Sequence, residues 1–264
     1  LNKLAKVPHD KERGLPLIYI CQATKPFEEV ILPEKSLEPI QDLLEEHRRQ
    51  DVLRSYGMQP SRKILFYGPP GCGKTLAAES IANELSLPFG IVQLDALVSS
   101  YLGETAANLR KVFDYVEQQK TVVLFDEFDA LGKRRNDGGE HGELRRVVNA
   151  VLQMVDAYQG ESIIIAATNH EDILDRAIWR RFDEIIEFPK PNATQIEKIL
   201  KLKLRGVRRN FETDSPEVLA LFKERSGADI ERIARRAIKS MLLRNQEFLE
   251  IKDLAKAARR EIKQ

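Results

Sequence analysis

The sequence predicts an α/β fold in which helices sandwich a parallel sheet, followed by a small all-helical domain. Up to Pro189, short apolar runs of strand length alternate with longer amphipathic segments of helix length. This alternation is typical of parallel sheets, because each crossover is usually a helix that covers one face. After Pro191 only helix-like segments follow. We therefore expect the boundary between the two domains at residues 188–192.

The chain divides into a lead-in, a large domain and a small domain. Residues 1–36 are expected to be an N-terminal lead-in or linker with one strand candidate, Leu17–Cys21. Residues 37–190 are expected to form the α/β domain and residues 191–264 the helical domain. The other strand candidates are Lys63–Tyr67, Phe89–Leu94, Thr121–Phe125, Ser162–Ala167 and Glu184–Phe188. The helix candidates are Ser36–Ser55, Leu76–Leu85, Ala106–Gln118, Glu143–Tyr158, Thr194–Leu204, Pro216–Arg225, Asp229–Arg244 and Lys252–Ile262.

Composition argues against several classes of protein. The 42 Lys and Arg residues nearly balance the 41 Asp and Glu residues, so nucleic acid is not the expected partner. The two cysteines cannot form a disulfide framework, which favours a reducing, cytoplasmic setting. No run approaches the roughly 18 apolar residues of a membrane helix, so no membrane span is expected in this chain. Because the first residue is Leu1 and not Met, we expect a piece of a longer chain.

A glycine-rich loop follows the strand Lys63–Tyr67. Its sequence, Gly68-Pro-Pro-Gly-Cys-Gly-Lys-Thr75, has the form G-x-x-x-x-G-K-[ST] of a phosphate-binding loop (P-loop). Backbone N–H groups of such a loop surround phosphate oxygens, while the lysine reaches the β- and γ-phosphates and the hydroxyl binds Mg²⁺. The loop therefore predicts a P-loop NTPase sheet that binds the phosphates of a nucleotide. The expected binding residues are Pro70, Gly71, Cys72, Gly73, Lys74, Thr75 and Leu76.

A pair of carboxylates follows a second apolar strand. Asp126 and Glu127 come directly after Val122–Phe125. Open α/β sheets bind ligands at the carboxyl ends of their strands, so this pair is expected beside the loop. Asp126 suits Mg²⁺ binding together with Thr75, and Glu127 suits general-base activation of the attacking water. Loop and pair together predict Mg²⁺-dependent hydrolysis of ATP to ADP and phosphate, with Lys74 among the catalytic groups.

Other polar residues have both a structural and a functional interpretation. Asn169 follows the strand Ile163–Ala167 and either caps a turn or positions water at the γ-phosphate; beside the other two motifs the catalytic interpretation is favoured. Arg180 and Arg181 are either solvated or salt-bridged, or stabilise phosphoryl transfer in a neighbouring subunit. Tyr101-Leu102-Gly103 either packs within its own domain or grips a ligand. The polar segment Gly132–Gly142 is expected to be a mobile loop.

From Phe27 to the C-terminus the chain resembles an AAA ATPase module of the AAA+ superfamily. It is similar to the group that contains protein unfoldases and microtubule-severing or membrane-remodelling ATPases, and it looks like a prokaryotic member. GPPGCGKT resembles the family's Walker A motif and VVLFDEFDAL its Walker B motif. IIIAATN resembles the strand that ends in sensor 1, which implies that role for Asn169. LDRAIWRRFDEIIEFPKP is similar to the second region of homology, which makes Arg180 and Arg181 the arginine-finger candidates.

The resemblance implies further contacts. SSYLGETAANLR is similar to the family's first pore loop, where Tyr101, Leu102 and Gly103 would grip a translocating polypeptide. The segment Gly227-Ala228-Asp229 looks like the lid near sensor 2, which implies that Ala228 approaches the nucleotide. The usual Ile-Gly-Gly of the adenine pocket is replaced here, and the implied adenine contacts are Val30 and Ile31. The two arginines are adjacent, as in the severing and membrane-remodelling branch, so either one is a candidate for the γ-phosphate.

The resemblance implies an ATP-hydrolysing ring that remodels, unfolds or threads a polypeptide client. The ring is expected to be a homo-oligomer, and a hexamer by analogy with the family. Its ATP sites would be shared between neighbouring subunits. One alternative is a nucleic-acid-associated switch or loader that binds DNA through Arg205–Arg209 or Gly132–Gly142. Another is a regulatory ATPase subunit that gates a partner such as a protease.

Overall fold

The computed structural model describes residues 6–11, 14–93, 97, 102–127, 151, 153–169 and 179–261. They form two compact units. The first, here called the sheet unit, draws on residues 1–27, 36–68 and 74–187. The second, the helical unit, draws on residues 28–35, 69–73 and 188–264. The tip of the glycine-rich loop, residues 69–73, thus groups with the C-terminal helices.

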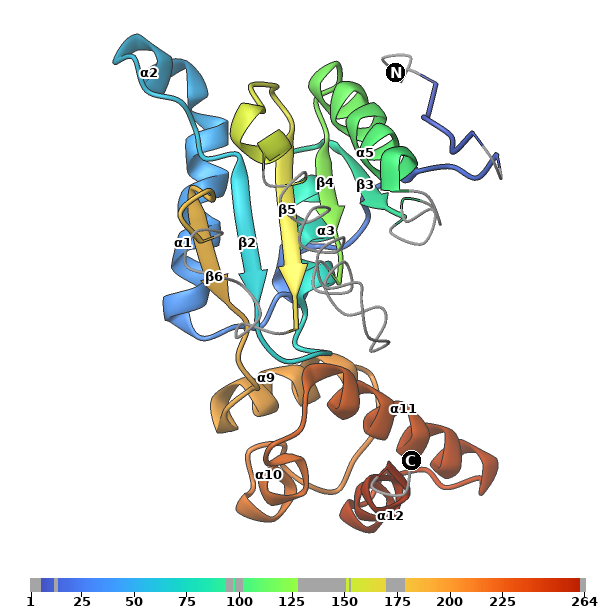
Figure 1. The fold of residues 1–264 in the computed structure, drawn as a ribbon. Coiled ribbons are helices and arrows are strands. Elements are labelled where there is room, and N and C mark those ends of the chain that lie inside the picture. Colours follow the sequence, from blue (N-terminus) through green and yellow to red (C-terminus); the bar gives the residue numbers. More distant parts are fainter. Residues whose placement is uncertain are drawn as a thin grey trace. The chain divides into compact units, whose positions relative to one another are not determined.

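The sheet unit contains a six-stranded sheet with the strand order β1-β3-β4-β5-β2-β6 (Figure 1). All neighbouring strands are parallel except β1, which pairs with β3 in the antiparallel sense. The predicted parallel sheet is confirmed, and the strand candidate in the lead-in forms one edge of it. The strands are β1 (Ile18–Gln22), β2 (Lys63–Tyr67), β3 (Pro88–Val92), β4 (Val122–Phe125), β5 (Ile163–Thr168) and β6 (Glu184–Glu187).

The central strands are apolar because both of their faces are covered. Every residue of β4 and β5 is buried. The helices α3 (Lys74–Glu84) and α5 (Leu102–Glu117) lie on opposite faces of the sheet (Figure 1). On the α5 face the Phe113 ring stacks on Phe125 with 5.6 Å between ring centroids. The sheet is therefore a rigid platform whose strand ends can hold polar groups in fixed positions.

The prediction of one continuous helix after the lead-in is wrong. The segment Ser36–Ser55 forms two helices, α1 (Glu34–Arg48) and α2 (Gln50–Ser55), separated at Arg49, whose ψ of 26° is not helical. No residue of α2 is buried, so no buried side chain holds this segment in line with α1. Most of the predicted helix Glu143–Tyr158 lies outside the described residues.

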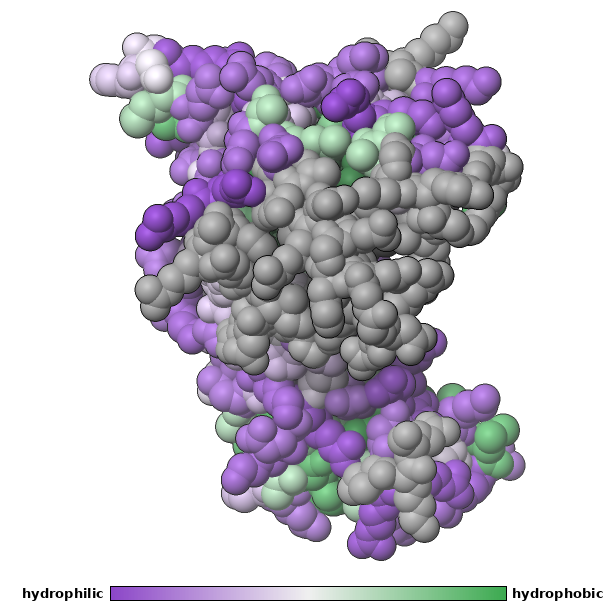
Figure 2. Space-filling view, viewed as in Figure 1, coloured by the Kyte–Doolittle hydropathy of each residue, from purple (hydrophilic) through white to green (hydrophobic). Residues whose placement is uncertain are grey.

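The helical unit confirms the four helices predicted after Pro191. They are α9 (Ala193–Lys203), α10 (Pro216–Phe222), α11 (Gly227–Leu243) and α12 (Ile251–Glu261), and they share one apolar core. Figure 2 shows hydrophobic surface at the end of α11, where Leu242 and Leu243 are 61% and 76% exposed. Across the described part of the chain, none of the helices combines the length and the apolar character that a membrane crossing needs.

Candidate active site

The parallel register brings the carboxyl ends of three strands to the same edge of the sheet. Tyr67 at the end of β2 is paired with Thr168 at the end of β5, and Phe125 at the end of β4 is paired with Ala166 of β5. Gly68, Asp126 and Asn169 are the residues that directly follow these three strands. The edge of the sheet where the strands end is therefore the candidate site, as expected for an open α/β sheet.

Lys74 is buried at this edge, with only 6% of the residue exposed. Its ammonium group donates to the Gly68 carbonyl at 2.6 Å and to Oδ1 of Asn169 at 2.8 Å. A buried ammonium group is costly unless its hydrogen bonds are satisfied, and these two bonds also fix where the group points. The structure thus brings together the lysine of the loop and the asparagine that follows β5.

Thr75 lies beside the acidic residue that follows β4. Its hydroxyl donates to Oδ2 of Asp126 at 2.7 Å. A hydroxyl and a single carboxylate are the kind of oxygen ligands that bind Mg²⁺ when substrate phosphates complete its coordination. Among the residues described here, no cluster of three or more His, Cys, Asp or Glu side chains could hold a metal ion. The donor set therefore fits a metal that arrives with a nucleotide.

Glu127 has a strained backbone next to this pair. Its φ is 49°, in the left-handed region that residues other than glycine rarely adopt, and its side chain is exposed. The Glu127 N–H donates to Oδ1 of Asp126 at 2.9 Å, which holds the turn after β4. Such strain persists where the surrounding structure imposes it and is concentrated at functional sites.

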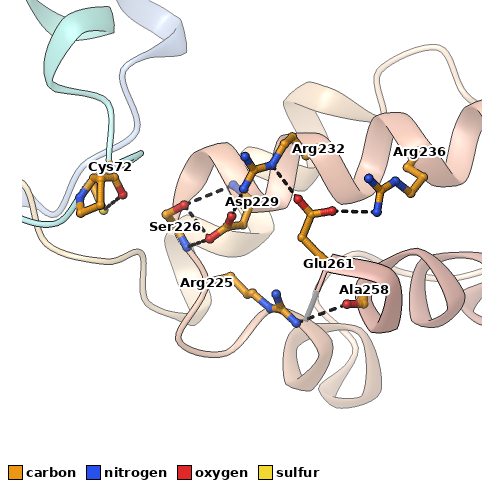
Figure 3. A network of polar contacts seen from close by, with 9 residues as sticks. Cys72, Arg225, Ser226, Asp229, Arg232, Arg236, Ala258 and Glu261 are labelled. Atoms are coloured by element: carbon orange, nitrogen blue, oxygen red, sulfur yellow. Dashed lines mark hydrogen bonds and ion pairs between the residues drawn. The ribbon is translucent and has the colours of Figure 1, made fainter. Parts of the chain in front are cut away.

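In the helical unit, the tip of the loop lies against the start of α11. The Ala228 N–H donates to the Gly71 carbonyl at 3.0 Å. Ser226 and Asp229 form a reciprocal capping box at the same helix end. Figure 3 shows that Arg232 links this helix end to α12. Arg232 pairs with Asp229 and, at 2.8 Å, with Glu261 of α12. Ala228, which the resemblance implies near the nucleotide, thus contacts the tip of the loop directly.

The Asp229 carboxylate is held in its ionised form. Partial burial acts to raise its pKa, but hydrogen bonds from the Ser226 side chain and backbone and from Arg232 lower that pKa below its ordinary value. An ionised carboxylate at the N-terminus of a helix is also favoured by the helix dipole. The start of α11, and with it the Ala228 N–H, therefore has a well-defined position in the helical unit.

Gly71 leaves no room for a side chain. A Cβ there would lie 2.8 Å from Oγ of Ser226 and 3.0 Å from Cβ of Ala228, and its φ of +74° disfavours other residues. We expect Gly71→Ala to lower both stability and ATP affinity. Gly206→Ala is the matched control, since Gly206 has φ +78° and no atom within 4 Å of an added Cβ.

Thermal unfolding and ATP titration of both glycine variants test this expectation. Each variant should lose about 1–2 kcal/mol from backbone strain, but only Gly71→Ala should also weaken ATP binding, because it displaces the loop tip from α11. Equal ATP affinity in the two variants would contradict the role of the contact between Gly71 and Ala228.

Of the remaining predicted site residues, the structure describes some, and others lie outside the described residues. In the helical unit Val30 is buried, Ile31 packs against the apolar core, and the Cys72 thiol is buried and contacts the Pro70 carbonyl. Pro70 is exposed. Gly73 has a positive φ of 98°, and Leu76 belongs to α3. Tyr101 lies outside the described residues, as does Gly132–Gly142, and Leu102 and Gly103 are described only as the start of α5.

The two arginines differ in their surroundings. Arg181 is ion-paired with Asp156, 3.1 Å from Nε to Oδ2, whereas Arg180 is exposed. Sequence reasoning missed Asp156, and it also missed the contact between Tyr67 and Trp179, whose rings meet edge to face at 5.0 Å. The aromatic residue directly before the paired arginines was the available signal for this second contact.

Comparison with known proteins identifies the class that this fold and site define. A family model described as "ATPase family associated with various cellular activities (AAA)" matches residues 64–190. The chain is 45% identical over 252 residues to the "Uncharacterized AAA family ATPase y4kL" of Sinorhizobium fredii (strain NBRC 101917 / NGR234), covering 92% of this chain and 76% of that protein. It is 34% identical over 211 residues to the "26S proteasome regulatory subunit S10B homolog B" of Arabidopsis thaliana, covering 77% of this chain and 53% of that protein.

These matches and the P-loop sheet define a nucleotide-binding ATPase module. The chain belongs to the AAA family of ATPases. The resemblance seen in the sequence is confirmed, and a prokaryotic member fits the relative from Sinorhizobium. Membership of this family implies that the chain binds and hydrolyses ATP.

Proposed function

We propose that this chain is a subunit of an ATP-driven ring, a hexamer, that remodels, unfolds or threads a polypeptide client. Each ATP site would be shared between neighbouring subunits. The observation that carries the proposal is the exposed Arg180, which has no ion-pair partner among the described residues. An arginine supplied by a neighbour stabilises the charge that develops on phosphate oxygens during transfer. Hydrolysis would then depend on assembly.

Within one subunit, five residues would share the chemistry. Thr75 and Asp126 would hold Mg²⁺, supported by their 2.7 Å hydrogen bond, and the ion would neutralise phosphate charge. Lys74 would contact the β- and γ-phosphates from the position that its bond to Asn169 supports. Asn169 would orient the attacking water, and Glu127 would take its proton.

Other contacts are proposed from the family resemblance. Val30 and Ile31 would border the adenine, and Ala228 would lie near the nucleotide, supported by its bond to Gly71. The triplet Tyr101, Leu102 and Gly103 would form the pore loop that grips the client. The remaining nucleotide contacts would come from Pro70, Gly71, Cys72, Gly73 and Leu76.

A polypeptide is the favoured client. The Arabidopsis relative is named as a regulatory subunit of the 26S proteasome, which supports work on proteins. The same name favours a second candidate function, a regulatory ATPase subunit that gates a protease. The two differ in whether the ring alone processes a client or does so only beside a protease. A role on nucleic acid is less favoured, because basic and acidic residues nearly balance.

We also propose a domain organisation and a cellular setting for the chain. We place the large nucleotide-binding domain at residues 37–190 and the helical lid at residues 191–264, with residues 1–36 as the lead-in. A cytoplasmic setting is supported by Cys21 and Cys72, the two cysteines of the chain, which are both free thiols.

The experiment that tests this function is ATP turnover per subunit, measured across protein concentrations with unfolded polypeptide or DNA added. Turnover should rise cooperatively with concentration, because subunits complete one another's sites, and polypeptide but not DNA should stimulate it. If turnover per subunit stayed constant down to concentrations where the protein is monomeric, the shared site would be contradicted. Stimulation by DNA alone would favour the nucleic-acid alternative.

A further inference from the structure

A polar cavity lies at the amino end of β2, the end of the strand that is remote from the phosphate loop. Its volume is about 650 Å³, which is within the range of sites for small ligands. It lies wholly within the sheet unit, between α2 and the segments that lead into β2, β5 and β6. Lys63 and Tyr67 begin and end β2, about 13 Å apart by strand geometry, so the cavity is separate from the candidate active site. Its charged lining residues are Arg54, Arg62, Lys63, Asp156, Glu161 and Asp183.

Contacts within the sheet unit hold the walls of this cavity in place. The segment before β2 is fixed to α1, because Oε2 of Glu46 accepts from the Ser61 N–H at 2.7 Å and the His47 ring donates to the Ser61 carbonyl at 2.7 Å. Arg62 joins this segment to the one before β5, since its Nη1 donates to the Gly160 carbonyl at 2.8 Å. The cavity walls are therefore preformed, as they are in most small-ligand sites.

The three carboxylates of the cavity already have donors of their own. Two are ion-paired, Glu161 with Arg54 at 2.7 Å and Asp156 with Arg181 at 3.1 Å. The third, Asp183, accepts two backbone N–H groups through Oδ2, both at 2.9 Å. The negative charges of the cavity are thus neutralised or hydrogen-bonded within the protein.

Two cations of the cavity, Arg62 and Lys63, are not matched in this way. Neither side chain has an ion-pair partner in the described part of the chain. The Lys63 ammonium makes one long hydrogen bond, 3.4 Å to the Asp156 carbonyl, and keeps its other donors for a ligand. The Arg62 guanidinium is held at Nη1 by neutral oxygens of Gly160 and Gln59. Both residues are partly buried, where charges interact more strongly than in water. The lining therefore offers unpaired positive charge and open donors.

We propose that this cavity binds a small hydrophilic anion, a phosphate or carboxylate compound, whose oxygens accept hydrogen bonds from Lys63 and Arg62. Most of the lining side chains are polar, so a hydrophilic ligand fits better than an apolar one. Hydrogen bonds from cationic side chains to phosphate or carboxylate oxygens are about twice as strong as neutral ones. The site is separate from the nucleotide edge of the sheet and does not rest on the proposed function.

Calorimetric titration of inorganic phosphate, and separately of succinate, gives the first test. The chain is first saturated with Mg²⁺ and a non-hydrolysable ATP analogue, so that the phosphate positions of the loop are already filled. Both anions should then bind in a saturable manner, at one site per chain. Binding of phosphate alone would identify a phosphate compound as the ligand, and binding of succinate alone would identify a carboxylate. No saturable binding of either anion would overturn the proposal.

Lys63→Gln should weaken this binding by about 10- to 150-fold, because a hydrogen bond from a charged group is lost. The backbone bonds of Lys63 to Asp183 do not need its side chain, so the variant should unfold at the same temperature as wild type. Lys120→Gln is the matched control, since Lys120 is an exposed lysine just before β4, at the same edge of the sheet, and does not line the cavity. It should bind both anions like wild type. Equal loss in the two variants would mean that general surface charge attracts the anion, and would overturn the site.

Glu161→Gln tests the site in the opposite direction. Loss of this carboxylate removes a repulsion on the anion and releases the Arg54 guanidinium from its ion pair. Anion binding should become about 1.5- to 5-fold tighter, the scale of an exposed ion pair. Glu84→Gln is the control, because Glu84 is also paired with an arginine, Arg48 at 2.9 Å, but lies outside the cavity. It should leave anion binding unchanged. Unchanged or weaker binding in Glu161→Gln would place the anion outside the cavity and overturn the proposal.

Discussion

Glu127→Gln is expected to reduce ATP turnover by about 10²- to 10⁴-fold, the typical contribution of a general base, while ATP still binds. The amide keeps the shape of the side chain but cannot accept a proton from water. Glu127 directly follows β4, its side chain is exposed, and its backbone is held at a φ of 49° beside Asp126. The variant should therefore accumulate with ATP bound and favour the assembled state.

Single-turnover hydrolysis and equilibrium ATP binding, measured on the same preparation, separate the two effects. Glu217→Gln is the control, because Glu217 is an exposed glutamate of α10 and the chemical change is the same. It should hydrolyse ATP normally. Normal turnover by Glu127→Gln would mean that another group activates the water.

Lys74→Ala is expected to weaken ATP binding by about 10- to 150-fold, because a hydrogen bond to a charged group is worth about 1.5–3 kcal/mol. The ammonium group is buried and held in place by the Gly68 carbonyl and Asn169. Removing it takes away a positive charge that is already positioned for phosphate. Thermal stabilisation by added ATP should be lost to a similar extent.

Calorimetric titration of ATP into wild type and variant checks this expectation. Lys111→Ala is a matched control, because the Lys111 ammonium also donates to two neutral oxygens, the His9 carbonyl at 3.2 Å and Oδ1 of Asn108 at 3.0 Å. Its ATP affinity should equal that of wild type. Unchanged ATP affinity in Lys74→Ala would contradict the assignment of the phosphate loop.

The features that were predictable from the sequence are those set by local pattern. Apolar runs of strand length predicted β2, β4 and β5, and residues that follow parallel strands must share an edge, which places Asp126 near Asn169. The capping-box pattern of Ser226 and Asp229 was also a local signal, and it marks the start of α11 two residues before the predicted start.

The features that were not predictable depend on contacts between distant segments. The ion pair of Arg181 with Asp156 and the bond from Ala228 to Gly71 join residues far apart in the chain, and no spacing or periodicity marks them. The break at Arg49 was missed because the sequence on either side remains compatible with one helix. Only the lack of burial in α2 distinguishes the two cases.

Trp179 is the single tryptophan of the chain, and its ring contacts the residue that directly precedes the phosphate loop while its backbone continues into Arg180. The protein therefore carries an intrinsic fluorophore that contacts the end of β2 and directly precedes the paired arginines. Selective excitation of tryptophan reports on this one location without chemical labelling. Nucleotide titrations and subunit mixing can thus be followed optically beside the paired arginines, on the unmodified chain.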